Sequence, residues 1–336
     1  MATLADVARR AGVSASTVSY VISGKRSISR ATRERVARAI AELGYHPHAG
    51  ARALASNRSN VIALMVPLRS DMYVPVIMEI VMAVASAARE YDQDVLLLTG
   101  DEGTAGVRRL AGSGGADTLL LMDVELDDAR IPVLRGLPTP AVLIGLPADS
   151  TGLTCIDLDF EAAGALGADH LADLGHREVA MIGPAENVYR RHTGFALRTL
   201  AGFNARSAER GLRSAHRASE GTFDAVAGTL TRLLEERPAT TGLVVQNEAA
   251  IPPLLSVLRQ LGRPVPDEMS VVAICPDQAA LQAWPRLTSV SIPAEEMGRG
   301  AVRLAMAQLL GRSTHGTTLL APELTVRESS RERPLS

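Results

Sequence analysis

The chain has 336 residues and a formal net charge of −2, and 46% of its residues are hydrophobic but only 3% aromatic. This length predicts two or three compact units, with cores of Ala, Val, Leu and Ile that suit alternating helices and buried parallel strands. No stretch approaches the ~20 apolar residues of a membrane span and the N-terminus has no signal-peptide core, which excludes a membrane protein and predicts a cytoplasmic one.

Residues 3–23 predict two short helices joined by a tight turn. Thr3 and Asp6 have the spacing of a capping box, and Gly12 ends the first apolar stripe where the chain must turn. Ser14 or Ser16 then caps the second helix. Its inward positions are Val18, Val21 and Ile22, and its outward positions are Ala15, Ser16, Thr17, Ser19 and Tyr20. This layout is typical of a helix-turn-helix that places its second helix in the DNA major groove.

The charge of the first segment differs from that of the remaining chain. Residues 1–60 hold ten basic and three acidic residues, a net charge of +7, whereas the remaining 276 residues carry −9. The helical pattern alone also fits an amphipathic helix pair of any small bundle. A basic arm on an acidic body favours a phosphate-binding headpiece attached to an effector domain.

A third helix is predicted after Ser29, its N-cap, with Gly44 as its C-terminal glycine. Residues 47–55 follow it and are too few for a stable isolated helix, because helix nucleation is costly. From the residues alone, this segment is a plain linker.

Three runs of this region, AGVSASTVSYVISG, SRATRERVARAIAELGY and ARALAS, resemble the LacI family of bacterial transcriptional regulators, and the similarity continues through almost the whole chain. The resemblance implies a helix-turn-helix headpiece over residues 1–57, whose hinge helix at 47–55 orders on operator DNA and wedges Leu54 into the minor groove. The family most often has Arg where Tyr20 stands, so the operator is expected to depart from the usual half-site. The predicted DNA contacts are Leu4, Ser14, Ala15, Ser16, Thr17, Ser19, Tyr20, Ser23, Thr32, Arg33, Tyr45, His48, Ala51 and Leu54.

From Val61 onward, short apolar runs alternate with helical stretches, which predicts βαβ units and two doubly wound α/β lobes. The resemblance implies a type I periplasmic-binding-protein-like core over residues 61–330. Its first lobe is expected at about 61–159 and 291–320, and its second at about 160–290 and 321–330. Ligands of such sheets bind at the carboxyl ends of the strands, here between the lobes.

The sequence offers no catalytic, metal-binding or cofactor-binding motif. No Rossmann, P-loop, nucleophile-elbow or zinc-protease string occurs. Cys155 and Cys275 lie far apart without metal-ligand spacing and are predicted to be buried free thiols, and His170 and His176 have no partners for a metal site. We therefore expect no enzyme activity, metal or cofactor.

The candidate effector-binding residues are Asp71, Tyr73, Arg191, Asn247 and Cys275. Arg191 resembles the arginine of the family's RxxGF motif, which binds effector hydroxyls, although a surface arginine is the alternative. Asn247 follows an apolar run and resembles the family's ligand-facing amide. Asp71 and Tyr73 stand where the family has NPFF, and Cys275 stands where it has a sugar-gripping aspartate.

Further departures at Gly145 and Leu146 also remove polar groups that the family has. A polyhydroxylated ligand would leave hydroxyl groups without hydrogen-bond partners, at a cost of about 1–3 kcal/mol for each group. A less polar glycoside, another metabolite and a degenerate pocket are therefore all open alternatives to a simple hexose.

These features predict a sequence-specific DNA-binding transcriptional regulator, most simply a repressor. Its partners are expected to be a pseudo-palindromic double-stranded operator, a sugar- or glycoside-like effector and a second copy of the chain. The alternative is a solute-binding protein of the same fold without a regulatory role, which would need a signal peptide and would lack the basic headpiece.

Overall fold

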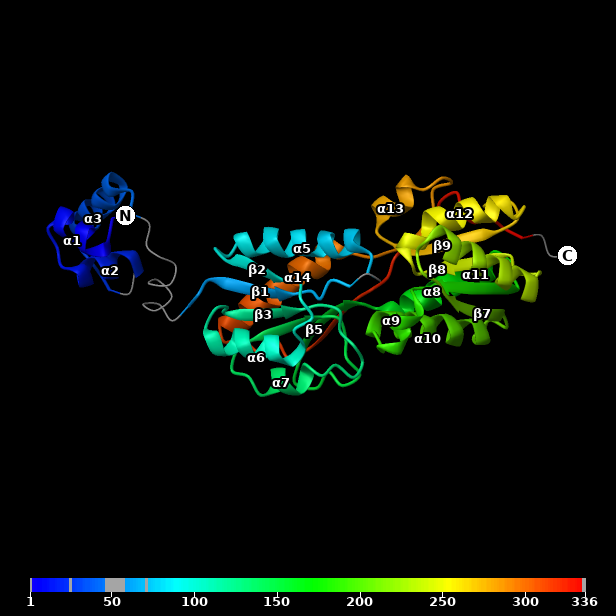
Figure 1. Cartoon of the computed structure of the whole chain (residues 1–336), viewed down its shortest axis with the longest axis horizontal. Coiled ribbons are helices and arrows are strands. Elements are labelled where there is room, and N and C mark those ends of the chain that lie inside the picture. The colour runs from blue at the N-terminus through cyan, green and yellow to red at the C-terminus, as the bar shows by residue number, and fades with distance from the viewer. Residues whose placement is uncertain (1, 24–25, 46–57, 70–71, 334–336) are drawn as a thin grey trace.

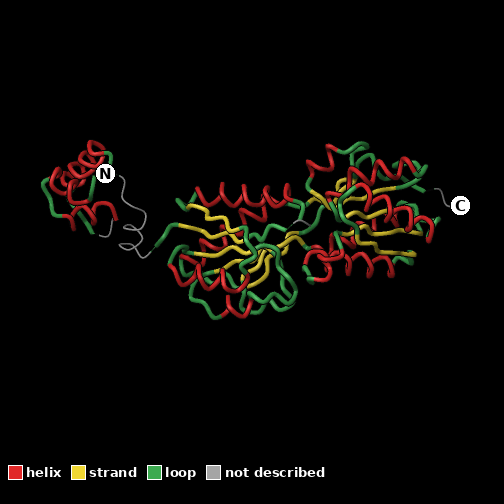
Figure 2. Tube along the Cα trace, in the orientation of Figure 1, coloured by secondary structure: helices red, strands yellow, loops and turns green. Residues whose placement is uncertain are grey.

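The computed structural model describes residues 2–23, 26–45, 58–69 and 72–333. A three-helix headpiece lies at one end of an elongated molecule, followed by two α/β lobes along the long axis (Figure 1). Strands form two separate groups, each between layers of helices (Figure 2). The predicted fold class is confirmed by this architecture. Among the described residues, no helix is long and apolar enough to cross a membrane.

The headpiece consists of α1 (Leu4–Ala11), α2 (Ala15–Ser23) and α3 (Arg30–Leu43). The predicted capping box is present at the start of α1, where Asp6 N–H donates to Thr3 Oγ1 and the Asp6 carboxylate accepts from Thr3 N–H. The turn that follows has Gly12 at φ 65°, a left-handed conformation that favours glycine. Ser29 is the N-cap of α3, and its Oγ accepts a hydrogen bond from the N–H of Thr32. These local signals are sufficient to set the helix bounds that the sequence predicts.

The first lobe has a parallel sheet in the order β11-β5-β4-β3-β1-β2. Two helices, α5 and α14, cover one face, and α6 and α7 cover the other (Figure 1). The strands are β1 (Val61–Met65), β2 (Asp94–Leu98), β3 (Thr118–Leu121), β4 (Ala141–Ile144), β5 (Thr154–Leu158) and β11 (Gly316–Leu320). The helices are α5 (Val74–Arg89), α6 (Gly103–Ser113), α7 (Ile131–Arg135) and α14 (Ala294–Leu309).

The second lobe repeats this plan in the order β12-β10-β9-β8-β6-β7, with only β12 antiparallel. Its strands are β6 (Glu178–Gly183), β7 (Arg213–Ala218), β8 (Gly242–Val245), β9 (Ser270–Cys275), β10 (Thr288–Ser291) and β12 (Leu324–Thr325). Its helices are α8 (Phe160–Asp173), α9 (Glu186–Arg190), α10 (Gly194–Glu209), α11 (Phe223–Glu236), the 3₁₀ turn η1 (Glu248–Ala250), α12 (Ile251–Gln260) and α13 (Asp277–Gln282). On one face, α8 and α10 pack so closely that a Cβ on Gly202 would lie 1.8 Å from the carbonyl oxygen of Glu161.

The chain passes between the lobes three times: after β5, after β10 and after β11. Each lobe is therefore assembled from segments that are distant in sequence. One apolar core extends across the junction and includes Ile156, Phe160 and Met297. The junction thus joins the two lobes through packed apolar side chains, of which Phe160 and Met297 also line the cavity described below.

Candidate DNA-binding surface and effector cavity

The N-terminal end of α2 presents small polar side chains to solvent. Val18 is fully buried in the headpiece core, whereas Ala15 and Ser16 are exposed. Of the two predicted caps, Ser14 is the one observed, since its Oγ accepts from the N–H of Thr17 at 3.1 Å. The hydroxyls of Ser14, Ser16 and Thr17 are linked at 2.8 Å. Hydroxyls at this end of a helix can donate to or accept from base edges.

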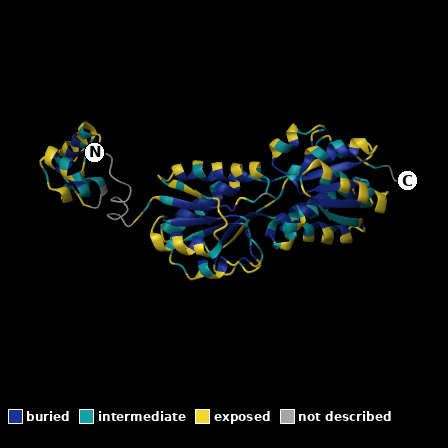
Figure 3. Ribbon diagram, in the orientation of Figure 1, coloured by how far each residue is buried: buried dark blue, intermediate teal, exposed yellow. Residues whose placement is uncertain are grey.

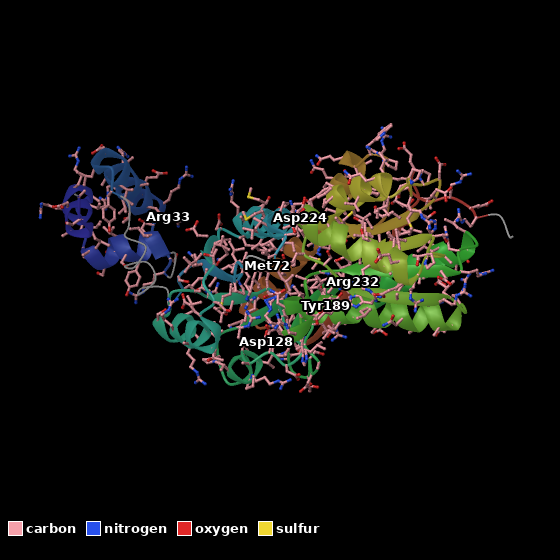
Figure 4. All side chains as sticks on the ribbon, turned by 45° about the vertical axis from the view of Figure 1, so that its right-hand side comes forward. Arg33, Met72, Asp128, Tyr189, Asp224 and Arg232 are labelled. Carbon is pink, nitrogen blue, oxygen red and sulfur yellow. The ribbon has the colours of Figure 1, made fainter. Side chains whose placement is uncertain are left out.

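Tyr20 and Arg33 extend this surface. The guanidinium of Arg26 lies 5.4 Å from the centre of the Tyr20 ring, a cation–π contact. Arg33 is exposed on the outside of the headpiece (Figure 4) and donates to the carbonyl of Ile28 at 3.0 Å. Thr32 lies beside it at the start of α3.

The other predicted DNA contacts divide into three groups. Leu4 packs against the headpiece core, and Tyr45 is part of that core and only 5% exposed, a packing role that the sequence prediction did not include for Tyr45. Ser19 is half-buried on α2, and Ser23 is the last residue of that helix. His48, Ala51 and Leu54 lie outside the described residues. For all of these residues, contact with DNA stays a prediction.

The positive charge of the headpiece is only partly neutralised. Arg9, Arg10 and Arg30 form ion pairs with Asp6, Glu42 and Glu34, respectively. Those three are the headpiece's acidic residues. The exposed arginines with no acidic partner among the described residues are Arg26, Arg33, Arg35 and Arg38. Unpaired surface arginines of this kind are suited to contact phosphates.

A cavity of about 630 Å³ lies at the junction of the lobes, a size that suits a small organic ligand. The first lobe contributes Tyr73, Asp123 and Asp157, among others, and Met72 marks the same wall in Figure 4. The second lobe contributes polar residues from the ends of its strands and from the α9–α10 region: Arg191, Glu220, Gln246, Asn247 and Glu248. Much of the remaining lining is apolar, including Phe160 and Phe195, whose ring centres are 5.7 Å apart.

Arg191 is positioned against acidic groups of the opposite lobe. Its guanidinium lies 4.0 Å from the Asp123 carboxylate and 3.9 Å from that of Glu125. Asp123 also pairs with Arg69 of its own lobe. Burial raises the pKa of Asp123, although Arg191 and Arg69 act in the opposite direction.

Two backbone hydrogen bonds connect the first lobe to the second beside Arg191. The N–H of Leu126 donates to the carbonyl of His192 at 2.8 Å, and the N–H of Gly194 donates to the carbonyl of Val124 at 3.0 Å. The first-lobe loop is itself braced by Arg130, which pairs with Asp128 and donates to the carbonyls of residues 122 and 123. The position of Arg191 therefore depends on how the two lobes meet.

Two carboxyl groups of the cavity are strongly perturbed. Burial raises the pKa of Asp157 to about 7 and that of Glu248 to about 7. Burial also raises the pKa of Tyr73, on the first lobe, and the nearby Glu248 of the second lobe adds to this shift. The charge of Glu248 in the second lobe therefore acts on the Tyr73 hydroxyl of the first lobe.

The structure brings three of the five predicted effector residues to this cavity, namely Tyr73, Arg191 and Asn247. Asp71 lies outside the described residues. Cys275 is not among the lining residues, since its thiol is fully buried in the core between the second sheet and its helices, and its contact with an effector stays a prediction. The physical reason is strand alternation, because Cys275 shares a face with Ala273, which packs toward α12.

Sequence reasoning missed Asp123, Asp157, Glu220, Gln246 and Glu248. A usable signal existed for two of them, since Asp123 follows and Asp157 interrupts an apolar strand near its carboxyl end. Cys155 and Cys275 are buried free thiols, as predicted. Among the described residues, no group of three or more His, Cys, Asp or Glu could hold a metal ion.

Comparison with known proteins covers both parts of the chain. The profile of bacterial regulatory proteins of the lacI family matches residues 3–48, and that of periplasmic binding protein-like domains matches residues 168–330. The HTH-type transcriptional regulator CelR of Thermobifida fusca is 32% identical over 97% of this chain and 98% of its own length. Catabolite control protein A of Priestia megaterium is 26% identical over 90% of this chain and 91% of its own.

Solved structures agree. A transcriptional regulator CelR–cellobiose complex superposes with a TM-score of 0.68 at 30% identity, covering 98% of this chain and 100% of that one. The lac repressor dimer bound to operator and the anti-inducer ONPF gives a TM-score of 0.84 at 24% identity over 98% of each chain, a likeness of fold. The alternative of a solute-binding protein without a regulatory role is not supported, because the matches include the headpiece. The chain belongs to the LacI family of bacterial regulatory proteins and is a DNA-binding transcriptional regulator, not an enzyme.

Proposed function

We propose that this protein is a cytoplasmic, dimeric repressor whose affinity for a pseudo-palindromic operator is controlled by a small sugar- or glycoside-like effector. The observation that carries the proposal is one cavity lined by side chains of both lobes in a chain that begins with a helix-turn-helix headpiece. The CelR relative was solved with cellobiose, which supports a carbohydrate-related effector.

The cavity offers a physical route for control. A ligand that contacts Tyr73 of the first lobe together with Arg191 and Asn247 of the second has a different affinity for each arrangement of the lobes. If effector and operator favour different arrangements, each lowers the affinity for the other by the same factor. The two backbone hydrogen bonds between the lobes beside Arg191 make the position of this residue depend on the arrangement of the lobes.

A second copy of the chain is proposed to cover one side of the first lobe. Met78 and Met82 are exposed on α5, and exposed residues run along the outer side of this helix in Figure 3. Beside it, the edge strand β2 exposes Leu96 and Leu97, at 43% and 38%. An apolar edge strand next to an apolar helix ridge is a liability in a monomer, and a two-fold dimer would bury both.

The proposal is tested by selecting DNA from random sequence with the full-length chain and then screening metabolites for release of the selected DNA. A two-fold related consensus and release by a specific metabolite are expected. Selection that returns no preferred sequence would contradict DNA-sequence recognition, and release by none of the metabolites would contradict effector control.

Operator binding is expected to weaken steeply with salt. Four arginines without acidic partners in each headpiece give about eight phosphate contacts per dimer, so a plot of log affinity against log salt should have a slope of about −7. Fluorescence anisotropy with labelled operator measures this slope. A nearly flat plot would show that the basic headpiece does not bind through phosphates.

Base readout and phosphate contact should be separable by mutation. Tyr20→Arg is expected to change the preferred bases, since it replaces a side chain that faces out beside the N-terminal half of α2. Arg33→Ala is expected to weaken binding to all sequences similarly, by about 1 kcal/mol, through loss of a phosphate contact. Titration against a set of operator variants distinguishes the two patterns, and identical patterns for both mutants would contradict this assignment.

A further inference from the structure

The side-chain amide donors that line the cavity are engaged by the protein itself. The side-chain amide of Asn247 donates to the carbonyl of Ser219 at 2.7 Å, and that of Gln246 donates to Thr199 Oγ1 at 2.6 Å. The guanidinium of Arg191 lies 4.0 Å from the Asp123 carboxylate and 3.9 Å from that of Glu125, farther than a hydrogen bond. Arg191 can therefore donate to ligand hydroxyls, whereas the two amides offer a ligand few further donors.

Two acceptors of the lining are incompletely paired. Asp157 is 3% exposed, and among the described residues its carboxylate accepts one hydrogen bond, from the neighbouring N–H of Leu158 at 3.0 Å. Gln246 is also 3% exposed, and its Oε1 is buried with no hydrogen-bond partner among the described residues. An unsatisfied buried acceptor costs about 1–3 kcal/mol, so these atoms require donors from a ligand.

The charged side chains of the lining also favour a ligand that carries positive charge. Asp157, Glu220 and Glu248 form no ion pair among the described residues, although all three line the cavity. Arg198 is the basic residue whose charge reaches Asp157, but its guanidinium donates to the carbonyls of Leu146 and Pro147. The lining therefore combines excess negative charge with excess acceptors.

We infer that the effector is a sugar- or glycoside-like molecule that carries a protonated amino group, selected by Asp157 of the first lobe and Glu248 of the second. This inference rests on the proposed function and specifies its ligand class. An ammonium group donates three hydrogen bonds and accepts none, which matches the unpaired acceptors, including Gln246 Oε1. An anionic ligand such as a sugar phosphate is disfavoured because it would add charge of the same sign.

The perturbed carboxyl groups support this assignment. Burial raises the pKa of both Asp157 and Glu248 to about 7, and the charge of Arg198 only partly offsets the shift of Asp157. A bound ammonium group supplies that charge and stabilises the ionised carboxylates. Because the two residues belong to different lobes, a cation held between them also favours one lobe arrangement over others.

The test compares matched sugars that differ in charge at one position, using the full-length protein and isothermal titration. The probes are D-glucosamine, D-glucose, N-acetyl-D-glucosamine and D-glucose 6-phosphate, with the galacto series in parallel. In at least one series, the amine is expected to bind at least about tenfold more tightly than its neutral analogues, and the phosphate is expected not to bind. Equal or tighter binding of the neutral sugars, or binding by neither amine, overturns the inference.

Charge-removing variants identify the residues responsible. Asp157→Asn and Glu248→Gln should each lower amine affinity about tenfold while leaving the affinity for the neutral sugar within about twofold. Glu161→Gln, an exposed carboxylate near the crossing after β5 that does not line this cavity, is the matched control. Thermal unfolding of each variant establishes that it is folded, and an unchanged amine preference in both folded variants contradicts the assignment.

The outcome is independent of DNA recognition. If a neutral sugar releases the selected operator, the proposed regulator stands and only the cationic ligand class is wrong. If no DNA is selected, the proposed function itself fails, whatever the cavity binds.

Discussion

Replacing Met82 with glutamate is expected to lower operator affinity about 10³-fold, because a dimer holds two headpieces on one operator and a monomer loses this gain in effective concentration. Met82 is 64% exposed on α5, the helix beside the edge strand β2. In a dimer it would be covered by the partner, and a buried, unpaired carboxylate at that position is costly. The substitution should have little effect on the folded monomer, since the side chain faces solvent there.

Sedimentation velocity measures the oligomeric state, and anisotropy with the selected operator measures affinity. The matched control is Leu319→Glu on β11, at the opposite edge of the same sheet, where Leu319 is 45% exposed. This control is expected to remain dimeric and to bind operator normally. A dimeric Met82→Glu protein with unchanged operator affinity would place the dimer interface elsewhere.

Arg191→Ala is expected to bind operator nearly as well as the unmodified protein but to lose release by the effector, which yields a permanent repressor. Its guanidinium lines the cavity on the second lobe and lies near carboxylates of the first. Loss of a charge-assisted contact to ligand costs about 2–4 kcal/mol, equivalent to roughly 30- to 1,000-fold in effector affinity. Asp123 is not left unpaired, because Arg69 remains beside it.

The matched control for this prediction is Arg190→Ala. Arg190 is the preceding residue, is exposed and does not line the cavity, so its removal should leave effector release unchanged. Release is measured as the effector concentration that dissociates half of the operator complex. A normal response of Arg191→Ala would show that the effector does not use this side of the cavity.

Much of the fold could be predicted because its signals are local. The capping box at Thr3, the turn at Gly12 and the cap at Ser29 each depend on residues within a few positions of one another. Strands β1, β6, β8 and β9 are short apolar runs buried on both faces, a pattern that the sequence displays directly. The family resemblance, which is confirmed, rests on these same local runs.

Both edge strands of the second sheet, β7 and β12, escaped prediction. β7, with the sequence RSAHRA, is polar because it is an edge strand, and its identity depends on pairing with β6. β12 is only two residues long and exists through its antiparallel pairing with β10. Residues Glu248–Ala250 form a 3₁₀ turn before α12, whose first turn contains prolines, so the start of this helical stretch is not evident from the sequence.

The headpiece, the alternation of strands and helices, and the position of Asn247 just after a strand could be inferred from the sequence, because these follow from side-chain periodicity and local hydrogen bonding. Which side chains line the cavity depends on packing between segments that are far apart in the sequence. Strand alternation turns Cys275 into the core, and lobe packing desolvates Asp157 and Glu248 without an ion pair among the described residues and places Arg191 near Asp123. Such burial and pairing depend on segments far apart in the chain, and desolvation is a property of the packed environment that no local pattern encodes.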